Sequence, residues 1–282
     1  MSAVILDGKA IAASIRQEIK QEIESKGIKC GLAVVLVGED EASKVYVKNK
    51  IKACSDVGIK SYAYYLQKTA EEDELLQLID ALNNDSNIHG ILVQLPLPSH
   101  INEKKIISAI NPQKDVDGFC AENMGKLFLG ETDVLAPCTP SGIIEILKRS
   151  NIEISGKHAV IVGRSNIVGK PAAFMMLREN ATVTIAHSKT KDLKSITSLA
   201  DILIVAVGKQ ELIDASMVKK GAVVIDVGIH RTEQGLKGDV KFGEVSKIAS
   251  AITPVPGGVG PMTIAMLLQN TLKAAKALME KQ

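Results

Sequence analysis

The sequence lacks the features that mark several classes of protein. It contains no Trp, and aromatic residues make up only 3% of its 282 residues, so the platforms on which single-stranded nucleic acids stack are missing. Its 34 basic and 32 acidic residues give a net charge of +2 and are spread along the chain, without the basic block that would follow a phosphate backbone. We therefore expect no nucleic-acid partner.

Long apolar runs and closely paired cysteines are also missing. No stretch approaches the roughly 18 uninterrupted apolar residues of a membrane span. Residues 1–9 show no basic region followed by an apolar run, which a signal peptide would have. The cysteines, which are Cys30, Cys54, Cys120 and Cys138, include no C-x-x-C pair for zinc or redox chemistry. We expect a cytoplasmic protein with reduced thiols, no membrane contact and no metal site.

Short apolar runs alternate with helical patterns along the chain, which is typical of α/β units on a parallel sheet. Apolar residues make up 46% of the chain, enough for two ordinary cores. Strands are expected at Leu32–Val37, Ser61–Leu66 and Gly90–Leu95, and then at His158–Val162, Thr182–Ala186, Ile202–Val207 and Ala222–Val227. Helices are expected at Glu41–Val57 and Glu71–Asn83. The predicted fold is two α/β domains.

The boundary between the domains follows from two features. An irregular stretch, Asn111–Pro137, separates the two series of strands, and Thr139-Pro140 then opens a helix with a capping residue and a proline. A very apolar helix expected over Met262–Leu278 must pack on something, and we expect it to return to the first domain, leaving a cleft between the domains. The predicted domains are residues 1–138 plus 262–282, and residues 139–261.

The first strand of the second domain leads into a turn that is typical of dinucleotide binding. Residues 159–171 read AVIVGRSNIVGKP, which is a strand, a glycine turn and a helix start. A Rossmann sheet binds a pyrophosphate at this place, through backbone N–H groups and the helix dipole. Ser165 stands where the second glycine of G-x-G-x-x-G would be, so an ordinary strand-to-helix turn remains an alternative.

The next strand bears on the choice of cofactor. In an NAD enzyme, an acidic residue about 20 residues further on binds the ribose 2′-hydroxyl, but here His187-Ser188-Lys189 follows the strand. Ser188 and Arg164 would instead hold a 2′-phosphate, so we predict a Rossmann-type NADP-binding domain. Ser188 and Lys189 could equally be ordinary turn residues.

Glycines follow the last two strands of this domain. Val207-Gly208 and Gly228-Ile229 stand at the carboxyl ends of the strands, where glycine lets the backbone approach a cofactor. We expect these four residues to line a nicotinamide pocket.

In the first domain, the helix expected over Glu41–Val57 carries a lysine within its apolar face. Projection at 100° per residue places Lys50 among Val47, Cys54 and other apolar residues, with Tyr46 one turn earlier on the same face. Removal from water disfavours the charged form of an amine, which suits proton transfer near neutral pH. The alternative is a lysine that reaches water from the edge of the face.

Two more segments of this domain carry polar residues at informative places. Gln94 ends an apolar strand and is followed by two prolines, and a polar residue at the carboxyl end of such a strand faces the ligand in this class of sheet. Asp115 and Asp117 lie in a turn, which could equally be a solvated surface loop.

Taken together, these segments resemble the bifunctional methylenetetrahydrofolate dehydrogenase/cyclohydrolase family over essentially the whole chain. The matching segments are Tyr46-Val-Lys-Asn-Lys50, Gly90-Ile-Leu-Val-Gln-Leu-Pro-Leu-Pro98, Lys114-Asp-Val-Asp-Gly118, Pro137-Cys-Thr-Pro140, Gly163-Arg-Ser-Asn-Ile-Val-Gly-Lys-Pro171 and Pro254-Val-Pro-Gly-Gly-Val-Gly-Pro-Met-Thr263. Matches of this length in the right order are very improbable by chance.

The resemblance implies a role for each matching residue. Lys50 would transfer protons, Gln94 would hydrogen-bond it, Tyr46 would stack on the aminobenzoyl ring of the folate, and Asp117 would bind the pterin. Leu95 and the loop residues Pro256, Gly257 and Gly258 would complete the substrate site. The residues expected to bind NADP are Thr139, Gly163, Arg164, Ser165, Ile167, Val168, Ser188, Val207, Gly208, Gly228 and Ile229.

The implied activity is NADP-dependent oxidation of 5,10-methylenetetrahydrofolate, followed by hydrolysis of the methenyl product to 10-formyltetrahydrofolate. The resemblance also implies a homodimer joined through the cofactor domain. Two alternatives remain from the sequence: a dehydrogenase with weak or absent hydrolysis, and a non-catalytic NADP-sensing protein that has kept the Rossmann half.

Overall fold

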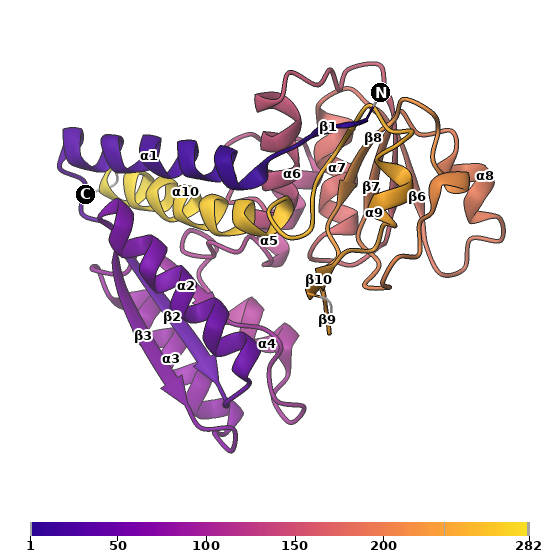
Figure 1. Ribbon diagram of the computed structural model, residues 1–282. Coiled ribbons are helices and arrows are strands. Elements are labelled where there is room, and N and C mark those ends of the chain that lie inside the picture. Colours follow the sequence, from indigo (N-terminus) through magenta and orange to yellow (C-terminus); the bar gives the residue numbers. More distant parts are fainter. Residues whose placement is uncertain (1, 234, 281–282) are drawn as a thin grey trace. The chain divides into compact units, whose positions relative to one another are not determined.

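The computed structural model describes residues 2–233 and 235–280 and consists of two compact α/β units (Figure 1). Unit 1 comprises Met1–Ala13 and Thr139–Thr263, and unit 2 comprises Ser14–Cys138 and Ile264–Gln282. Each unit has its own parallel sheet and its own buried core. The predicted class, two α/β domains, is confirmed.

Unit 2 is built on a three-stranded parallel sheet with the order β3-β2-β4. The central strand β2 (Gly31–Val37) is buried along its whole length, and β3 (Lys60–Leu66) and β4 (Gly90–Val93) flank it. Helix α2 (Glu41–Val57) covers one face of the sheet and α3 (Glu72–Asn84) the other (Figure 1). The chain goes from β2 to β3 on one side and then from β3 to β4 on the other. The carboxyl end of β2 is therefore the switch point at which ligands bind in such sheets.

Helix α2 has clear stop and start signals. The side chain of Asp40 accepts a hydrogen bond from Ser43 N at its beginning, and Gly58 adopts a left-handed conformation (φ 85°) at its end. These signals give α2 the bounds that the sequence predicted.

The stretch Asn111–Pro137, predicted to be irregular, contains a helix, so that prediction was wrong in part. Helix α5 (Ala121–Phe128), which has Cys120 as its N-terminal cap, buries only Asn123 and Leu127. So short a helix with two inward positions leaves little apolar periodicity in the sequence. A second short helix that was not foreseen, α4 (Glu103–Ala109), begins with Asn102 as its cap.

Unit 1 is built on a six-stranded sheet with the order β1-β11-β8-β7-β5-β6, in which every pair is parallel. Its strands are β1 (Val4–Ile5), β5 (His158–Val162), β6 (Thr182–Ala186), β7 (Ile202–Val205), β8 (Val223–Asp226) and β11 (Ala251–Ile252). The chain goes from β5 to β6 on one side and then to β7 on the other. The carboxyl end of β5 is therefore the switch point of a Rossmann-type sheet.

Short helices and one hairpin complete unit 1. The helices are α6 (Cys138–Arg149), α7 (Gly169–Arg178), α8 (Leu193–Thr197), the 3-10 helix η1 (Ala215–Met217) and α9 (Phe242–Val245). Strands β9 (His230–Thr232) and β10 (Gly235–Lys237) pair as an antiparallel hairpin.

The first residues of the chain lie in a different unit from the one predicted, because the predicted division placed residues 1–138 together. Residues 1–13 group with unit 1, because β1 pairs with β11 and Lys9 N donates a hydrogen bond to Gly257 O. A strand of two residues gives no recognisable sequence signal. Helix α1 (Gly8–Lys26), which the sequence reading did not identify, continues from there into unit 2.

The chain ends in helix α10 (Val259–Met279), and its part from Ile264 onward groups with unit 2. There it lies beside α1, and Lys276 Nζ pairs with Glu22 Oε1 at 2.7 Å (Figure 1). Although α10 is strongly apolar, no helix in the described residues is long and apolar enough to cross a membrane.

Candidate active site

Lys50 is a buried lysine of unit 2. Its side chain lies on the inner face of α2, the residue is only 8% exposed, and its Nζ donates a hydrogen bond of 3.0 Å to Gln94 Oε1. Because an ammonium group can only donate, Gln94 must present its oxygen to it. Gln94 in turn donates from Nε2 to Leu95 O at 2.8 Å, which fixes the amide in that orientation.

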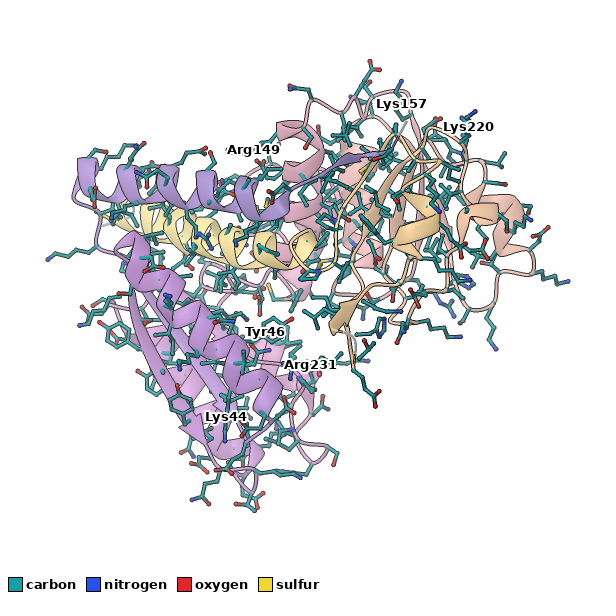
Figure 2. All side chains as sticks on the ribbon, in the orientation of Figure 1. Lys44, Tyr46, Arg149, Lys157, Lys220 and Arg231 are labelled. Carbon is teal, nitrogen blue, oxygen red and sulfur yellow. The ribbon has the colours of Figure 1, made fainter. Side chains whose placement is uncertain are left out.

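Tyr46 precedes Lys50 by one helical turn, but its surroundings differ. Figure 2 labels Tyr46 on α2, and the residue is 41% exposed. Its ring therefore has a face that a flat ligand can contact, while the amine one turn later is withdrawn from water.

Asp115 and Asp117 have different functions in their turn. Asp115 is buried, and its carboxylate accepts hydrogen bonds from Gly118 N at 3.1 Å and Cys120 N at 2.8 Å. Within residues 2–233 and 235–280, no group donates a hydrogen bond to the half-buried Asp117. The turn is therefore not a solvated loop: one carboxylate holds its backbone, and the other remains available to a ligand.

The same turn is attached to the sheet. Ile91 N donates to Lys114 O at 2.7 Å, so the segment continues the sheet beside β4. The buried Lys114 donates from Nζ to Leu82 O and Asp85 O at 3.1 and 2.8 Å. Asp117 consequently projects from a rigid turn at the edge of the sheet.

The electrostatics of Asp117 follow from its burial. Burial raises the pKa of its carboxyl from 3.8 to about 6, the positive charge of Lys50 acts to lower this pKa, and the negative charge of Asp115 raises it. Burial, followed by the negative charge of Asp117, also raises the pKa of the Cys138 thiol well above its ordinary value. Cys138 is therefore a neutral thiol beside a carboxylate and an amine, and not a nucleophile.

Asn270 supports this site, although the sequence reading did not single it out. From α10 its Nδ2 donates to Val116 O at 2.8 Å and to Ala136 O at 2.9 Å, and the Cys138 thiol donates to the same Val116 O at 3.2 Å. These bonds hold the backbone directly before Asp117. The sequence signal that would have identified Asn270 is an amide on the inward face of a strongly apolar helix.

In unit 1, the predicted dinucleotide turn is tightly packed at the carboxyl end of β5. Gly163 has a φ of 130°, and a side chain there would collide with the carbonyl of Ala206. A side chain at Gly169, where α7 begins, would likewise collide with the carbonyl of Gly163. Both glycines are therefore needed for the close approach of strand and helix.

The start of α7 differs from the prediction, in which its backbone N–H groups are free to bind a pyrophosphate. Val168 N and Gly169 N donate to Ser165 Oγ at 3.2 and 3.3 Å, so the protein itself caps α7. Because this oxygen already accepts two bonds, the Ser165 hydroxyl hydrogen is left to point outward as a donor. Arg164 and Ile167 are exposed beside it, and Val168 is half-buried.

The turn after β6 presents Ser188 next to this segment. Gly163 N donates to Ala186 O at 2.8 Å, which joins the ends of β5 and β6. Within the turn, His187 N donates to Thr190 Oγ1 and Lys189 N donates to His187 Nδ1. His187 therefore shapes the turn, and Ser188 is left exposed.

The other predicted cofactor and substrate residues of unit 1 lie in three places. Val207 and Gly208 follow β7 and donate their N–H groups to Asp239, while Gly228 and the exposed Ile229 follow β8. Thr139 on α6 shares a hydrogen bond of 2.9 Å with Thr263 on α10.

Pro256, Gly257 and Gly258 lie between β11 and α10 in unit 1. Gly258 packs so closely on Gly8 that a side chain at Gly8 would collide with its carbonyl. The glycines of this loop thus serve close packing on the start of α1.

Comparison with known proteins gives matches over both units. A family model described as the tetrahydrofolate dehydrogenase/cyclohydrolase catalytic domain matches residues 6–117, and one described as the NAD(P)-binding domain of the same family matches residues 137–279. A protein of Agathobacter rectalis named bifunctional protein FolD is 60% identical over 278 residues, which cover 97% of this chain and 99% of that protein.

Solved structures of proteins from the same family are also similar to this chain over nearly its whole length. The bifunctional methylenetetrahydrofolate dehydrogenase/cyclohydrolase FolD of Campylobacter jejuni is 54% identical, with a TM-score of 0.95 over 98% of this chain and 99% of that one. The methylenetetrahydrofolate dehydrogenase-cyclohydrolase of Trypanosoma brucei, solved with NADP and an inhibitor, is 38% identical, with a TM-score of 0.93 over 98% of both chains.

The raised pKa of Asp117 predicts a pH-dependent effect of Asp117→Asn on stability. Since the pKa of about 6 in the fold lies above the ordinary 3.8, the folded chain binds this proton more tightly than the unfolded chain. Stability from this group is complete below about pH 4 and is lost as the pH rises through about 6. Asp117→Asn should therefore raise the free energy of unfolding by about 1–3 kcal/mol near pH 7.5 and by almost nothing near pH 4.

Urea unfolding at a series of pH values measures this difference. Asp56→Asn is the matched control, because Asp56 is exposed and lies on α2, the same helix as Lys50. An Asp117→Asn effect that stays constant from pH 4 to pH 7.5 would contradict the prediction.

Proposed function

The chain belongs to the tetrahydrofolate dehydrogenase/cyclohydrolase family, and on this premise we propose how its residues carry out the two reactions. It is a bifunctional enzyme that oxidises 5,10-methylenetetrahydrofolate with NADP and hydrolyses the methenyl product to 10-formyltetrahydrofolate. The folate chemistry is assigned to unit 2 and the NADP site to unit 1.

We propose that Lys50 transfers protons in the hydrolytic step. Water that adds to the methenyl carbon must lose a proton, and the ring nitrogen that leaves must gain one. The observation that carries the proposal is the bond of 3.0 Å from the buried Lys50 to Gln94, with Asp117 close enough for the charge of Lys50 to act on its pKa. Gln94 holds the amine at one place while leaving its other N–H donors free for water or substrate.

Substrate binding is assigned to the residues around this amine. The two carboxylate oxygens of Asp117 accept no hydrogen bond from the described residues. A pterin presents an amino group and a ring N–H that can donate to these two oxygens. Tyr46 offers the exposed ring face for the aminobenzoyl group, and Leu95 lies next to Gln94 as an apolar contact. Pro256, Gly257 and Gly258 complete the proposed substrate set.

The residues at the carboxyl edge of the unit 1 sheet fit NADP by their chemistry. The Ser165 hydroxyl, the exposed Arg164 and the exposed Ser188 are all donors, and His187-Ser188-Lys189 provides no carboxylate that would repel a 2′-phosphate. When bound, NADP supplies the hydride acceptor of the oxidation. The protein's part in that step is to place both ligands, with Thr139, Gly163, Ile167, Val168, Val207, Gly208, Gly228 and Ile229 as the further proposed contacts.

We further propose a homodimer joined through unit 1. Among the strands of the described residues, β6 hydrogen-bonds only to β5 and so forms one edge of the six-stranded sheet. Large apolar side chains are exposed on this strand and on the helix that packs beside it, with Ile185 on β6 at 39% and Leu177 on α7 at 60%. An unpaired edge with apolar neighbours suits a second copy of the chain.

A cytoplasmic location is also proposed. All four cysteines are free thiols, and each is buried within its unit. This pattern is typical of a reducing compartment.

Lys50→Met is the direct test of the catalytic assignment. The variant keeps the length and volume of the side chain but cannot exchange a proton, so methenyl hydrolysis should fall by about 100-fold or more while NADP reduction falls by less than about tenfold. Methenyl decay and NADPH formation are followed separately by absorbance. Lys48→Met, at an exposed position of the same helix, is the control. Equal loss of both reactions in a folded Lys50→Met protein would refute the roles.

The NADP assignment predicts a change in cofactor preference. Replacing Arg164 and Ser188 together by Ala should raise the KM for NADP by about 10- to 100-fold and leave the KM for NAD nearly unchanged, because only the 2′-phosphate loses its donors. Lys194→Ala, an exposed change on α8, serves as the control. A parallel rise of both KM values would show that these residues act elsewhere.

The dimer proposal is tested by the mass of the protein in solution. Light scattering at micromolar concentration should give a dimer for the wild type and a monomer for Ile185→Lys, because a charge would be buried in the interface. Tyr65→Lys, at a 64% exposed residue on β3, should remain a dimer. A monomeric wild type would exclude the proposal.

A further inference from the structure

Two buried carboxylates in unit 1 have no place in the chemistry proposed so far. Asp226 ends β8 and is 3% exposed, and Asp239 follows the hairpin β9–β10 and is 0% exposed. A buried carboxylate is costly unless several donors satisfy it. The groups that satisfy these two carboxylates show what they hold in place.

Asp226 organises the base of the hairpin. Its Oδ1 accepts from Gly228 N at 3.0 Å and from Asp239 N at 2.9 Å, and its Oδ2 accepts from Val240 N at 2.9 Å. A side chain at Gly238 would collide with this carboxylate. The segment that leaves β8 and the segment that returns from the hairpin are therefore bound to one group, which fixes the position of Asp239.

Asp239 reaches from there to the turn after β7. Its Oδ2 accepts from Val207 N at 2.7 Å and from Gly208 N at 3.0 Å. Two successive N–H groups thus converge on one oxygen, and Gly208 takes the φ of +64° that this turn requires. Both N–H groups are committed to the protein, so the turn faces outward with its carbonyl oxygens and side chains.

His230 supplies the third donor to the same carboxylate. Its Nε2 lies 2.8 Å from Asp239 Oδ1, and because an ionised carboxylate only accepts, Nε2 carries the proton. His230 is the first residue of β9, and the next residue, Arg231, is labelled on the hairpin in Figure 2. The hairpin and the turn after β7 are therefore joined through one carboxylate.

We propose that Asp239 is a positioning residue for the dehydrogenase step, holding the Val207–Gly208 turn at the nicotinamide side of the cofactor site, with His230 fixing the carboxylate from the hairpin. The inference rests on the proposed function, since this turn lies at the carboxyl end of β7, where a Rossmann sheet receives the nicotinamide. Hydride transfer is sensitive to small displacements of the cofactor ring. Hydrolysis of a methenyl substrate uses Lys50 and Gln94 of unit 2 and does not need this turn.

Asp239→Asn tests the proposal because the amide keeps the shape but has only one accepting oxygen. Either the two backbone N–H groups or the Nε2–H of His230 then faces an NH₂ group, which cannot accept a hydrogen bond, so residue 239 no longer joins the turn to the hairpin. The dehydrogenase kcat should fall at least about tenfold, with hydrolysis of added methenyltetrahydrofolate unchanged within about twofold. The control is Asp214→Asn, which alters an exposed hydrogen-bond acceptor in the same unit.

Two substitutions of His230 test the proposal independently, because neither alters the buried carboxylate. Glutamine can offer an amide N–H where the imidazole Nε2 donates, whereas alanine offers nothing. His230→Gln should keep the dehydrogenase kcat within about threefold of the wild type, and His230→Ala should lose about as much as Asp239→Asn.

The outcomes separate this inference from the proposed function. If the wild type lacks NADP-dependent oxidation or hydrolysis, the proposed function fails. If the wild type performs both, the inference is overturned when Asp239→Asn lowers both reactions equally or neither. It is also overturned when His230→Gln and His230→Ala behave alike.

Discussion

An ammonium group withdrawn from water needs an acceptor, and the hydrogen bond from Lys50 to Gln94 meets that need. The bond joins helix α2 to the end of β4, so the amine is fixed relative to the sheet rather than free on a flexible side chain. Asp117 adds a carboxyl whose pKa is raised to about 6 by its burial. The amine, the amide and a carboxyl that accepts no hydrogen bond from the described residues form the site to which we assign proton transfer to a bound folate.

Elsewhere in the chain, buried polar groups hold backbone in place instead of meeting substrate. Asp115 binds the backbone N–H groups of its own turn, and Asn270 binds the carbonyl directly before Asp117. In unit 1, Asp226 and Asp239 do the same for the loops after β8 and β7. Each holds irregular backbone, whose N–H and carbonyl groups lack the partners that neighbouring strands supply within a sheet.

Much of the fold was predictable because parallel strands form short apolar runs and the longer helices have apolar periodicity. The expected strands at His158–Val162 and Thr182–Ala186 have the bounds that the structure gives, and so has helix Glu41–Val57. The errors concern elements with little such periodicity. Helix α5 buries two residues, and β1 has only two residues, so neither leaves a pattern over a window of useful length.

The sequence by itself determined the alternation of strands and helices, the two-domain class and the family, because each depends on local patterns and ordered motifs. It also placed Lys50 on the apolar face of its helix. Only the tertiary structure decided which of two neighbouring acids supports the backbone and which stays open to a ligand. It likewise brought Asn270 to the turn of Asp117, and Asp239 to the turn after β7. Those contacts join residues far apart in the chain, and no local pattern encodes which distant N–H or carbonyl a buried polar group will meet.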